Sequence, residues 1–488
     1  MKTLKEWWAG INGGAGPWLV IGKGPTFERR HEFDLSPYRT VALNHVIREV
    51  TADVASAVDI DVVRDCADAI EKNAKFLLVP RYPHVPPAPG AARQYAHAGE
   101  KRIDAYFTEI PVLQRLSDAG RLVVYDLASH KGAPEAEPQI PFGAFSGDVV
   151  VTILAMLGAK KLRLLGVDGG ASYAPTFTDL ADKTLLANGL TSFDAQSRGI
   201  GRAIWKYDLD CGPLVSEVPM RIFIGTDVSQ LLGARVLEYT IKRCSSISSQ
   251  FDTMLHVNAP MPKDPKNQPR TEFSFNRFAI PKLAGYQGRA VYVDADMQVF
   301  KDFRGLWDTD FGGASLLHCA TSDPKRPKQF AVMLMDCARL DWDLETIVRG
   351  LDEGKYDYDA LMKEFCIVPR DQVREGLSHH WNSLEEYIPG ETCLIHYTDM
   401  PTQPWVSRKN KNGDLWVQAL RDALRDGYVT EEELKKAVKD GYARPSLLGQ
   451  LKVGRDAWPT FNRTLGAVMD IGYKPHRKLF KRLKSGKK

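Results

Sequence analysis

Two aspartates one residue apart close a short apolar run that has the length of a buried strand. The run Ala290-Val291-Tyr292-Val293 is followed by Asp294-Ala295-Asp296. Alternate residues of a strand share a face, and where a strand ends the backbone can turn, so that both carboxylates converge on one hard divalent cation. A cation held there can bridge the phosphates of a nucleotide and neutralise a diphosphate leaving group. The pattern predicts an α/β domain with a metal site at a strand end.

Phosphatases of the haloacid dehalogenase type offer an alternative, since they also carry two aspartates after an apolar strand. They have Thr or Val two residues beyond the second aspartate, where this chain has Gln298. Their strand also lies near the start of its domain, whereas this one lies deep in the chain. Both differences disfavour a phosphatase.

A second strand end is predicted upstream. The apolar stretch Arg221 to Gly225 ends in Thr226 and Asp227, and Leu231 to Arg243 then shows apolar residues at helical spacing. Strand, polar turn and helix in this order are typical of a nucleotide-binding α/β domain, whose ligands bind at the carboxyl ends of strands. Arg277 begins a further helical stretch to Ala284, either as a ligand-binding residue or as an ordinary exposed arginine.

A histidine downstream is a candidate third ligand. His396 follows Leu394-Ile395 and opens the segment that ends in Gln403-Pro404-Trp405. Neutral imidazole suits manganese-type ions beside carboxylates. The alternative is a core histidine with a satisfied ring.

Together these pieces resemble glycosyltransferase family 8, the glycogenin and bacterial lipooligosaccharide galactosyltransferase group. The shared order is Ile-Gly-Thr-Asp at 224–227, an Arg-bearing helix, Tyr-Val-Asp-Ala-Asp at 292–296, Trp-Asn at 381–382 and His-Tyr-Thr…Pro-Trp at 396–405. The resemblance covers residues 219–405. It implies a GT-A fold, a nucleotide-diphosphate sugar donor, a manganese or magnesium ion, and retention at the anomeric carbon.

The resemblance also implies roles for particular residues. The metal ligands become Asp294, Asp296 and His396, and catalysis is expected to depend on Asp294, Asp296 and Gln403. The nucleotide sugar is expected to contact Thr226, Asp227, Arg277 and Asn382.

This chain departs from the family pattern near the donor. The closing motif of the family has Gly and Lys where this chain has Asp399 and Gln403. A Lys there would donate a charge-assisted hydrogen bond to the diphosphate, whereas Gln offers only a neutral donor of roughly half the strength. The Asp-Gln pair of the family has no clear counterpart, and Gln329-Phe330-Ala331 replaces its Asn-Ser-Gly or Asn-Ala-Gly. The identity of the donor sugar is therefore open.

The amino-terminal region predicts a separate doubly wound sheet. Trp18 to Ile21 is a short apolar strand that meets the turn Gly22-Lys23-Gly24, where bare backbone N–H groups are expected to approach a phosphate. A third Gly is missing, which disfavours NAD. Strands and helices then alternate: strands are expected at 41–44, 54–58, 76–79 and 162–167, and helices at 60–72 and 146–158.

These residues resemble family 42 sialyltransferases and the Rossmann-like domain of flagellin-modifying Maf proteins. The matching pieces are Gly22 to Thr26, Asn44, Ser146-Gly147 and Leu157 to Asp168. The resemblance implies a cytidine nucleotide site that includes Gly22, Gly24, Asn44, Ser146, Gly147 and Asp168, with Tyr173 near the phosphate. The sialyltransferases carry a His general base after the Asp168 motif, but no His occurs between His130 and His256. A binding or structural domain without transfer activity is the alternative.

Composition and the two ends bear on location. Seven Cys without a CxxC pair favour a reduced, cytoplasmic protein, and residues 1–10 lack an apolar signal core. Residues 474–488 hold eight Lys or Arg and no acid, with Leu479, Phe480 and Leu483 at helical spacing. This favours weak contact with an anionic membrane face over a solubilising tail, and nothing indicates nucleic-acid readout.

The resulting hypothesis is an α/β enzyme with two Rossmann-like nucleotide-binding domains, the second of GT-A type. The expected domains are 1–215, 219–425 and a helical, basic 426–488, with a boundary between Asp208 and Pro219. The expected activity is metal-dependent hexose transfer to a polysaccharide, lipooligosaccharide or glycoprotein acceptor. The alternatives are a non-catalytic nucleotide-sugar-binding protein, and a bifunctional enzyme whose first domain also transfers a sugar.

Overall fold

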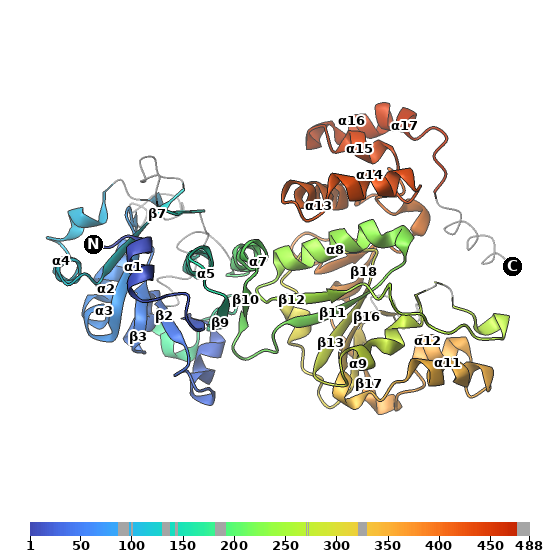
Figure 1. Ribbon diagram of the computed structural model, residues 1–488, viewed down its shortest axis with the longest axis horizontal. Coiled ribbons are helices and arrows are strands. Elements are labelled where there is room, and N and C mark those ends of the chain that lie inside the picture. Colours follow the sequence, from blue (N-terminus) through green and yellow to red (C-terminus); the bar gives the residue numbers. More distant parts are fainter. Residues whose placement is uncertain are drawn as a thin grey trace. The chain divides into compact units, whose positions relative to one another are not determined.

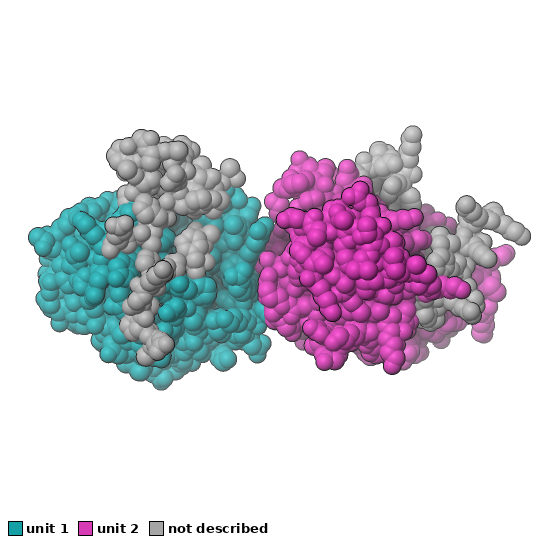
Figure 2. Space-filling view, turned by 90° about the horizontal axis from the view of Figure 1, so that it is seen from above, with its two compact units in different colours: residues 1–219, 245–248 teal, residues 220–244, 249–488 magenta. Residues whose placement is uncertain are grey.

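The chain divides into two compact units. The computed structural model describes residues 1–85, 97–98, 101–128, 137–141, 145–180, 192–269, 271, 273–320 and 329–475 (Figure 1). Unit 1 comprises Met1–Pro219 and Ser245–Ser248, and unit 2 comprises Met220–Cys244 and Ser249–Lys488 (Figure 2). Each unit has its own sheet and its own apolar core, so the two are described separately.

Unit 1 is built on an eight-stranded sheet in the order β10-β9-β1-β2-β3-β4-β7-β8, and all its neighbouring strands are parallel. The chain adds strands on one side of β1 and then crosses to its other side with β9. Ligands of such sheets bind where the order reverses, which here lies between β1 and β9. The strands are β1 (Trp18–Ile21), β2 (Arg39–Leu43), β3 (Ala52–Ser56), β4 (Ala74–Pro80), β7 (Leu122–Leu127), β8 (Gln139–Ile140), β9 (Lys161–Leu165) and β10 (Asp210–Pro213), beside the small pair β5 (His84–Val85) and β6 (His97–Ala98).

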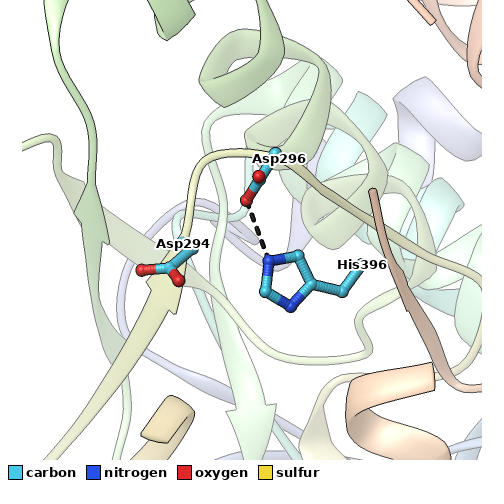
Figure 3. A group of neighbouring side chains, drawn as sticks. All are labelled: Asp294, Asp296 and His396. Atoms are coloured by element: carbon cyan, nitrogen blue, oxygen red, sulfur yellow. Dashed lines mark ion pairs between the residues drawn. The ribbon is translucent and has the colours of Figure 1, made fainter. Parts of the chain in front are cut away.

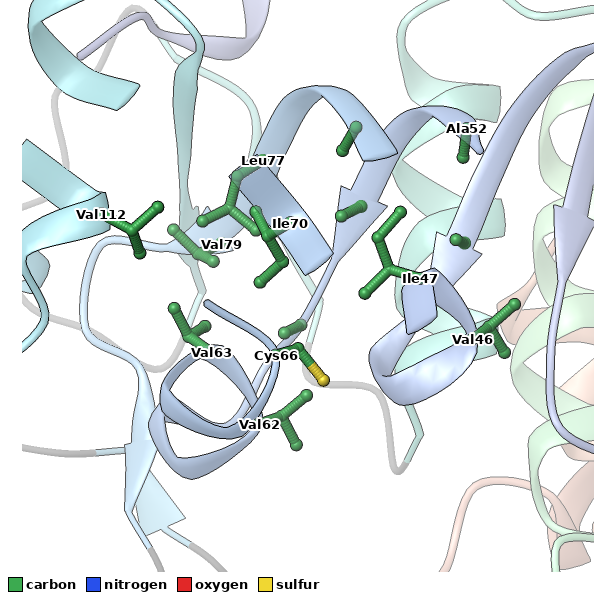
Figure 4. Packing of buried hydrophobic residues seen from close by; sticks show 14 of the residues in the cluster. Val46, Ile47, Ala52, Val62, Val63, Cys66, Ile70, Leu77, Val79 and Val112 are labelled. Carbon is green, nitrogen blue, oxygen red and sulfur yellow. The ribbon is translucent and has the colours of Figure 1, made fainter. Parts of the chain in front are cut away.

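Helices cover both faces of this sheet. One apolar cluster joins α1 (Leu4–Gly10), α5 (Ser146–Met156) and α7 (Gln196–Tyr207) to one face. The other joins α2 (Ile60–Asp65), α3 (Ala67–Asn73) and α4 (Pro111–Asp118) to the opposite face (Figure 4). Short 3-10 turns complete the unit: η1 (Pro25–Glu32), η2 (Asn44–Arg48), η3 (Ile103–Tyr106) and η4 (Pro175–Leu180).

The predicted helix 60–72 is in fact two helices. They meet at Cys66, whose backbone leaves the helical region at φ −109° and ψ 12°. Val62 and Val63 before the break and Ile70 after it are buried in the same cluster (Figure 4). A change of direction there keeps apolar side chains of both helices against the sheet, which helical spacing alone did not predict.

Unit 2 combines a mixed sheet with a small accessory sheet. The six-stranded sheet has the order β12-β11-β13-β16-β15-β17, in which β12, β11 and β13 are parallel and β16 is antiparallel to β13. The accessory sheet has the order β14-β19-β18. The strands are β11 (Met220–Gly225), β12 (Ser249–Asp252), β13 (Arg289–Asp294), β14 (Met297–Val299), β15 (Leu316–Cys319), β16 (Gln329–Asp336), β17 (Val373–Leu377), β18 (Ser383–Leu384) and β19 (Leu394–His396).

Helix α8 (Leu231–Cys244) follows β11 as predicted and lies between the sheet and the carboxy-terminal helices α13 and α14 (Figure 1). Apolar side chains and ion pairs join them: Leu232 and Val236 share a core with Trp416, and Arg243 is paired with Asp422. The carboxy-terminal helices are α13 (Gly413–Arg425), α14 (Glu431–Lys439), α15 (Ser446–Gln450), α16 (Trp458–Arg463) and α17 (Leu465–Met469). Residues 431–469 are therefore packed helices of unit 2.

The other helices of unit 2 are α9 (Ile280–Leu283), α10 (Arg304–Trp307), α11 (Leu344–Asp352) and α12 (Tyr358–Glu364). The 3-10 turns are η5 (Val228–Gln230), η6 (Pro265–Asn267), η7 (Asn276–Ala279), η8 (Cys337–Arg339), η9 (Arg370–Gln372), η10 (His379–Asn382), η11 (Met400–Thr402) and η12 (Arg455–Ala457). The α/β class with two Rossmann-like sheets is thus confirmed, and unit 2 fits a GT-A type domain.

Some predictions concern segments that the structure describes only in part. The basic run 474–488 lies outside the described residues from position 476 onward. The described part of the chain has no helix both long enough and apolar enough to pass through a bilayer.

Candidate active site

Neighbouring strands bring the predicted acidic residues to one edge. Strand β13 is apolar and buried from Ala290 to Val293, and it ends at Asp294, which lies opposite Gly225 at the end of β11. After two intervening residues, β14 begins and pairs antiparallel with β19, so that Met297 lies opposite His396. Asp296, just before β14, and His396, at the end of β19, therefore lie close together although they are far apart in the sequence.

Asp294, Asp296 and His396 form one cluster (Figure 3). Each offers a ligand atom, and these atoms lie within 4.8 Å of one another. His396 Nε2 lies 3.1 Å from Asp296 Oδ1, while His396 Nδ1 lies 3.0 Å from Asn382 Oδ1. Two carboxylates and an imidazole held by a second partner are a donor set that fits a manganese-type cation. The structure thus brings together the three predicted ligands.

The charges in this cluster depend on one another. Burial by itself lowers the pKa of His396, but the nearby Asp296 and Asp294 carboxylates together raise it above its ordinary value. Burial raises the pKa of Asp294, and the Arg277 guanidinium partly opposes that rise. The carboxylates and the imidazole therefore shift one another's pKa, and a cation bound there would meet two carboxylate ligands and one imidazole.

Tyr292 is hydrogen-bonded to the Asp294 carboxylate. Its hydroxyl donates to Asp294 Oδ1 at 2.6 Å and fits only because Gly225 has no side chain, since a Cβ there would lie 2.1 Å from the hydroxyl oxygen. Burial raises the pKa of Tyr292 well above its usual range, so the hydroxyl stays a donor. Sequence reasoning missed this residue, although alternate residues of a strand share a face and Tyr292 is two positions before Asp294.

Arg277 is buried and faces the same carboxylate through Tyr292. Its Nη2 donates to the Tyr292 hydroxyl at 3.0 Å and lies 3.7 Å from Asp294 Oδ1, and its guanidinium stacks 4.4 Å from the Tyr292 ring centroid. Two further N–H groups bind the carbonyls of Ser274 and Phe330. The alternative of an ordinary exposed arginine is therefore wrong. Contact of Arg277 with the nucleotide-sugar donor stays a prediction. The guanidinium that would make it is already held in place by these hydrogen bonds.

Gln403 has a different environment from the one predicted. Its side chain is 0% exposed, and its amide Nε2 donates to Asp296 Oδ2 at 2.8 Å and to the Tyr397 carbonyl at 3.1 Å. Both N–H groups of the amide are thus used within the protein. The expected direct hydrogen bond to a diphosphate is not supported by this arrangement, because it would require one of these bonds to break.

The remaining predicted residues of unit 2 lie at the same edge or behind the cluster. Thr226 and Asp227 follow β11; Thr226 is buried, and Asp227 Oδ1 accepts from the Ser229 N–H at 2.8 Å. Asn382 is buried and holds His396 as described above. Contact of Thr226 and Asp227 with a nucleotide stays a prediction.

In unit 1, Gly22 and Gly24 allow the turn after β1 to pack closely against the turn after β9. Gly22 N–H donates to the Leu165 carbonyl and Gly24 N–H to the Gly166 carbonyl, both at 2.7 Å. A Cβ on Gly22 would lie 2.3 Å from the Gly166 oxygen, and one on Gly24 would lie 2.6 Å from Asp168 Oδ2. The prediction that these N–H groups approach a phosphate is therefore wrong: the close approach that excludes a side chain is to the turn after β9.

Asp168 holds the same two turns together. Its carboxylate accepts from the Thr26 N–H at 2.8 Å and from the Thr26 hydroxyl at 2.7 Å. The hydroxyl of Thr26 in turn accepts from the Gly166 N–H at 2.8 Å. This arrangement explains the motif by the architecture of the turns, and a ligand role for Asp168 stays a prediction.

Other residues of unit 1 face the point where the strand order reverses. Asn44 has a left-handed backbone at φ 53°, and its Oδ1 accepts from the Ser146 hydroxyl at 3.3 Å. Gly147 is the second residue of α5, whose amino end carries the partial positive charge of a helix. Ser146, Asn44 and Gly147 thus come together as predicted from the sequence.

Sequence reasoning did not single out Lys23 and His45. Lys23 Nζ lies 4.5 Å from the Tyr173 ring centroid, and burial lowers the pKa of Lys23 to about 8. His45 is 2% exposed, and neither ring nitrogen has a hydrogen-bond partner among the described residues. Burial, with the nearby Lys23 and Arg48 charges, lowers the pKa of His45 to about 4.

Comparison with known proteins supports the reading of unit 2. Residues 228–358 match the family described as glycosyl transferase family 8. The match confirms the predicted family 8-like domain and the prediction of a glycosyltransferase. It includes Asp294 and Asp296 and ends before His396 and Gln403. The resemblance of unit 1 to family 42 sialyltransferases and Maf proteins stays a prediction.

Individual proteins share less with the chain. Protein CDI of Arabidopsis thaliana is 33% identical over 94 residues, which cover 18% of this chain and 36% of that protein, so the chain spans about a third of this relative's length. Galactosyltransferase LgtC with donor and acceptor sugar analogs aligns at 13% identity over 45% of this chain and 100% of LgtC, with a TM-score of 0.31. The bifunctional glycosyltransferase WbbM aligns at 12% identity over 87% of this chain and 99% of WbbM, with a TM-score of 0.33.

Proposed function

We propose that unit 2 transfers a hexose from a nucleotide-diphosphate sugar to a glycan acceptor and retains the anomeric configuration. The observation that carries this proposal is the cluster of Asp294, Asp296 and His396, whose two aspartates lie inside the match to glycosyl transferase family 8. Surface polysaccharide, lipooligosaccharide and glycoprotein glycans are the acceptor classes of the proposal.

The three clustered side chains would hold a manganese or magnesium ion. Such an ion would supply positive charge that offsets the negative charge developing on a diphosphate leaving group. The protein keeps the ligands in place: Tyr292 donates to Asp294, Asn382 Oδ1 accepts from His396 Nδ1–H, and Gln403 donates to Asp296. A pre-arranged ligand set avoids reorganisation during the reaction.

Donor hydrolysis tests this proposal against a protein that only binds nucleotide sugars. The full-length protein is incubated with uridine-, guanosine- and cytidine-diphosphate sugars, with Mn²⁺ or with a chelator, and release of the nucleotide diphosphate is followed. Metal-dependent release from at least one donor supports transfer. Binding of a donor without turnover in the presence of any tested acceptor would favour the non-catalytic alternative.

A second candidate function belongs to unit 1, where we propose binding of a cytidine nucleotide. Support comes from Lys23, Asn44 and Ser146 beside the reversal point of the sheet, and from the amino end of α5. These groups combine a cation, polar side chains and a helix terminus, which together suit a phosphate. Calorimetric titration with cytidine and uridine nucleotides tests the proposal, and failure of both to bind would remove it. Transfer by unit 1 is not part of the proposal.

We also propose that the protein acts in the cytoplasm, attached weakly to an anionic membrane face. The basic run 474–488 supports this, as do Leu465, Val468 and Ile471, which are 56%, 61% and 78% exposed just before it. Apolar side chains beside basic ones are typical of interfacial binding. Co-sedimentation of the full chain and a 1–473 truncation with anionic and neutral vesicles tests the idea, and equal binding of both chains would contradict it.

A further inference from the structure

Gln403 lies in a closed ring of hydrogen bonds around Asp296. The Tyr397 N–H donates to the Asp296 carbonyl at 2.8 Å, and the Tyr397 carbonyl accepts from Gln403 Nε2 at 3.1 Å. The same Nε2 donates to Asp296 Oδ2 at 2.8 Å, which closes the ring. Gln403 thereby links the backbone of Asp296 to its own carboxylate, so the side chain cannot rotate without breaking a bond.

The orientation of the Gln403 amide is dictated by its neighbours. Both of its close partners, Asp296 Oδ2 and the Tyr397 carbonyl, are acceptors, so only the NH₂ end of the amide can face them. The Gln403 carbonyl Oε1 consequently lies buried with no hydrogen-bond partner among the described residues. Folded proteins leave few buried polar atoms unsatisfied, and those that occur call for a reason. Gln403 Oε1 is left unsatisfied because the amide is turned so that its NH₂ group donates to Asp296.

The bond also decides which oxygen of Asp296 is available. Oδ2 is engaged by Gln403, while Oδ1 faces His396 Nε2 at 3.1 Å. An imidazole that binds a cation through Nε2 gives up that contact, and Oδ1 is then left facing the cation. Asp296 would therefore bind through one oxygen, and Gln403 would keep the other.

We propose that Gln403 is a positioning residue, which holds Asp296 as a one-oxygen ligand of the divalent cation and does not contact the donor diphosphate. The inference rests on the proposed function of unit 2. A neutral donor suits this task, because it orients the carboxylate and leaves its negative charge to the cation. A lysine at the same place would pair with Asp296 and compete with the cation.

The test compares three variants of the full-length chain. Gln403→Met removes the donor at similar size, and Gln403→Lys replaces it with a charged one. Gln298→Met is the matched control: Gln298 is also buried, and its side chain is hydrogen-bonded to the Tyr397 hydroxyl at 2.8 Å and to the Leu415 carbonyl at 3.2 Å rather than to a metal ligand. Mn²⁺ binding is measured by the electron paramagnetic resonance signal of the free ion, and folding by the melting temperature without metal.

We expect Gln403→Met to weaken Mn²⁺ binding by about 10- to 100-fold, the usual effect of removing a partner of a ligand. Gln403→Lys should weaken it at least as much, with a metal-free melting temperature no lower than that of Gln403→Met. Gln298→Met should lower the melting temperature and leave the Mn²⁺ dissociation constant within about threefold of the original, because a merely structural loss does not act on the cation.

Other outcomes distinguish failure of the positioning role of Gln403 from failure of the metal-dependent function proposed for unit 2. Unchanged Mn²⁺ affinity in both Gln403 variants would overturn the inference and leave the metal site standing. Tighter binding of uridine diphosphate by Gln403→Lys in the presence of a chelator would also overturn it, because that result places residue 403 at the phosphates. Failure of the unmodified chain to bind Mn²⁺ would overturn both the inference and the metal-dependent function.

Discussion

The two sheet edges of this molecule differ in the groups that surround their buried ionisable side chains. In unit 2, Asp294, Asp296 and His396 lie close together, and each has a further partner in Tyr292, Gln403 or Asn382. In unit 1, burial lowers the pKa of Lys23 to about 8 and raises that of Asp59 to about 6, and His45 has no hydrogen-bond partner among the described residues. At His396 the neighbouring carboxylates outweigh burial and raise the pKa, whereas burial prevails at Lys23, Asp59 and His45, as it also does at Asp294.

This difference indicates what each edge can take up. An acidic cluster with its orientation already fixed suits a cation, which adds charge without requiring movement. A buried lysine near the amino end of a helix suits an anion, because a phosphate favours the charged form of the lysine that burial disfavours. Substitutions that remove one group at a time from each edge distinguish the two sites.

The largest expected effect is loss of an acidic ligand in unit 2. Asp294→Ala or Asp296→Ala should reduce turnover by about 10²-fold or more, since several kcal/mol of transition-state stabilisation depend on the cation. Turnover is measured across a range of Mn²⁺ concentrations. Asp336→Ala is the control, because Asp336 lies opposite Arg289, at the other end of β13. Near-normal turnover insensitive to a chelator would contradict the assignment of these ligands.

His45 should make unit 1 sensitive to acid. Its folded pKa of about 4 lies below the ordinary 6.5, so the unfolded chain takes up the proton first and stability falls as the pH drops from 6.5 towards 4. The full effect of this shift is about 3 kcal/mol. Asp59 acts in the opposite direction, because its folded pKa of about 6 is raised above 3.8 and protonation in this range favours the folded state.

His45→Leu isolates the histidine from that opposing group. Urea unfolding at pH 7 and pH 4.5 should show a smaller loss of stability on acidification in His45→Leu than in the original chain. His31→Leu, a change at an exposed histidine, should leave the pH dependence as it was. If the free energy of unfolding depends on pH in the same way in the original chain and in His45→Leu, then protonation of His45 is not what destabilises unit 1 in acid.

Lys23 should matter for anion binding in unit 1 by a smaller factor. Lys23→Met should weaken binding of cytidine monophosphate by about tenfold, the scale of one charge-assisted hydrogen bond. In the original chain the affinity should decline as the pH rises through about 8, where Lys23 loses its proton. Calorimetry in an Asp294→Ala, Asp296→Ala background confines the measurement to unit 1. Lys75→Met, a change at an exposed lysine, should have no effect; equal affinities of the Lys23 and Lys75 variants would place the anion elsewhere.

The smallest effect is expected for the Tyr292 hydroxyl. Tyr292→Phe removes the donor to Asp294 but keeps the ring on which Arg277 stacks, and Arg277 still faces the carboxylate. Mn²⁺ affinity should fall by roughly 1 kcal/mol or less, as for the loss of one hydrogen bond to a ligand, and the melting temperature should also fall, because the buried Arg277 Nη2 loses the hydroxyl that accepts its hydrogen bond. A loss as large as that of Asp294→Ala would mean that the hydroxyl itself enters the metal site.

The sequence predicted the positions of the ligands better than the partners of those ligands. Asp294 and Asp296 follow from an apolar strand with a polar end, and the short β19 places His396 beside them. Tyr292 was within reach of the same strand period. Gln403 was not, because its partner depends on how the chain turns back after η11, 107 residues away from Asp296. In unit 1 the sequence pointed to Gly22 and Gly24. It could not show why a side chain is excluded there, because the atoms that exclude it belong to the distant turn after β9.

The antiparallel pairing of β14 with β19 has a consequence for how the chain reaches its native state. Met297 and His396 are neighbours in space but distant in sequence, so forming this pair closes a long loop at a cost in chain entropy. Before that closure the imidazole is missing from the cluster, and a cation has only a partial set of ligands. Mn²⁺ should therefore bind the finished unit far better than its precursors and, by mass action, raise the melting temperature of unit 2 with its concentration. The ion would report on assembly as well as take part in the reaction.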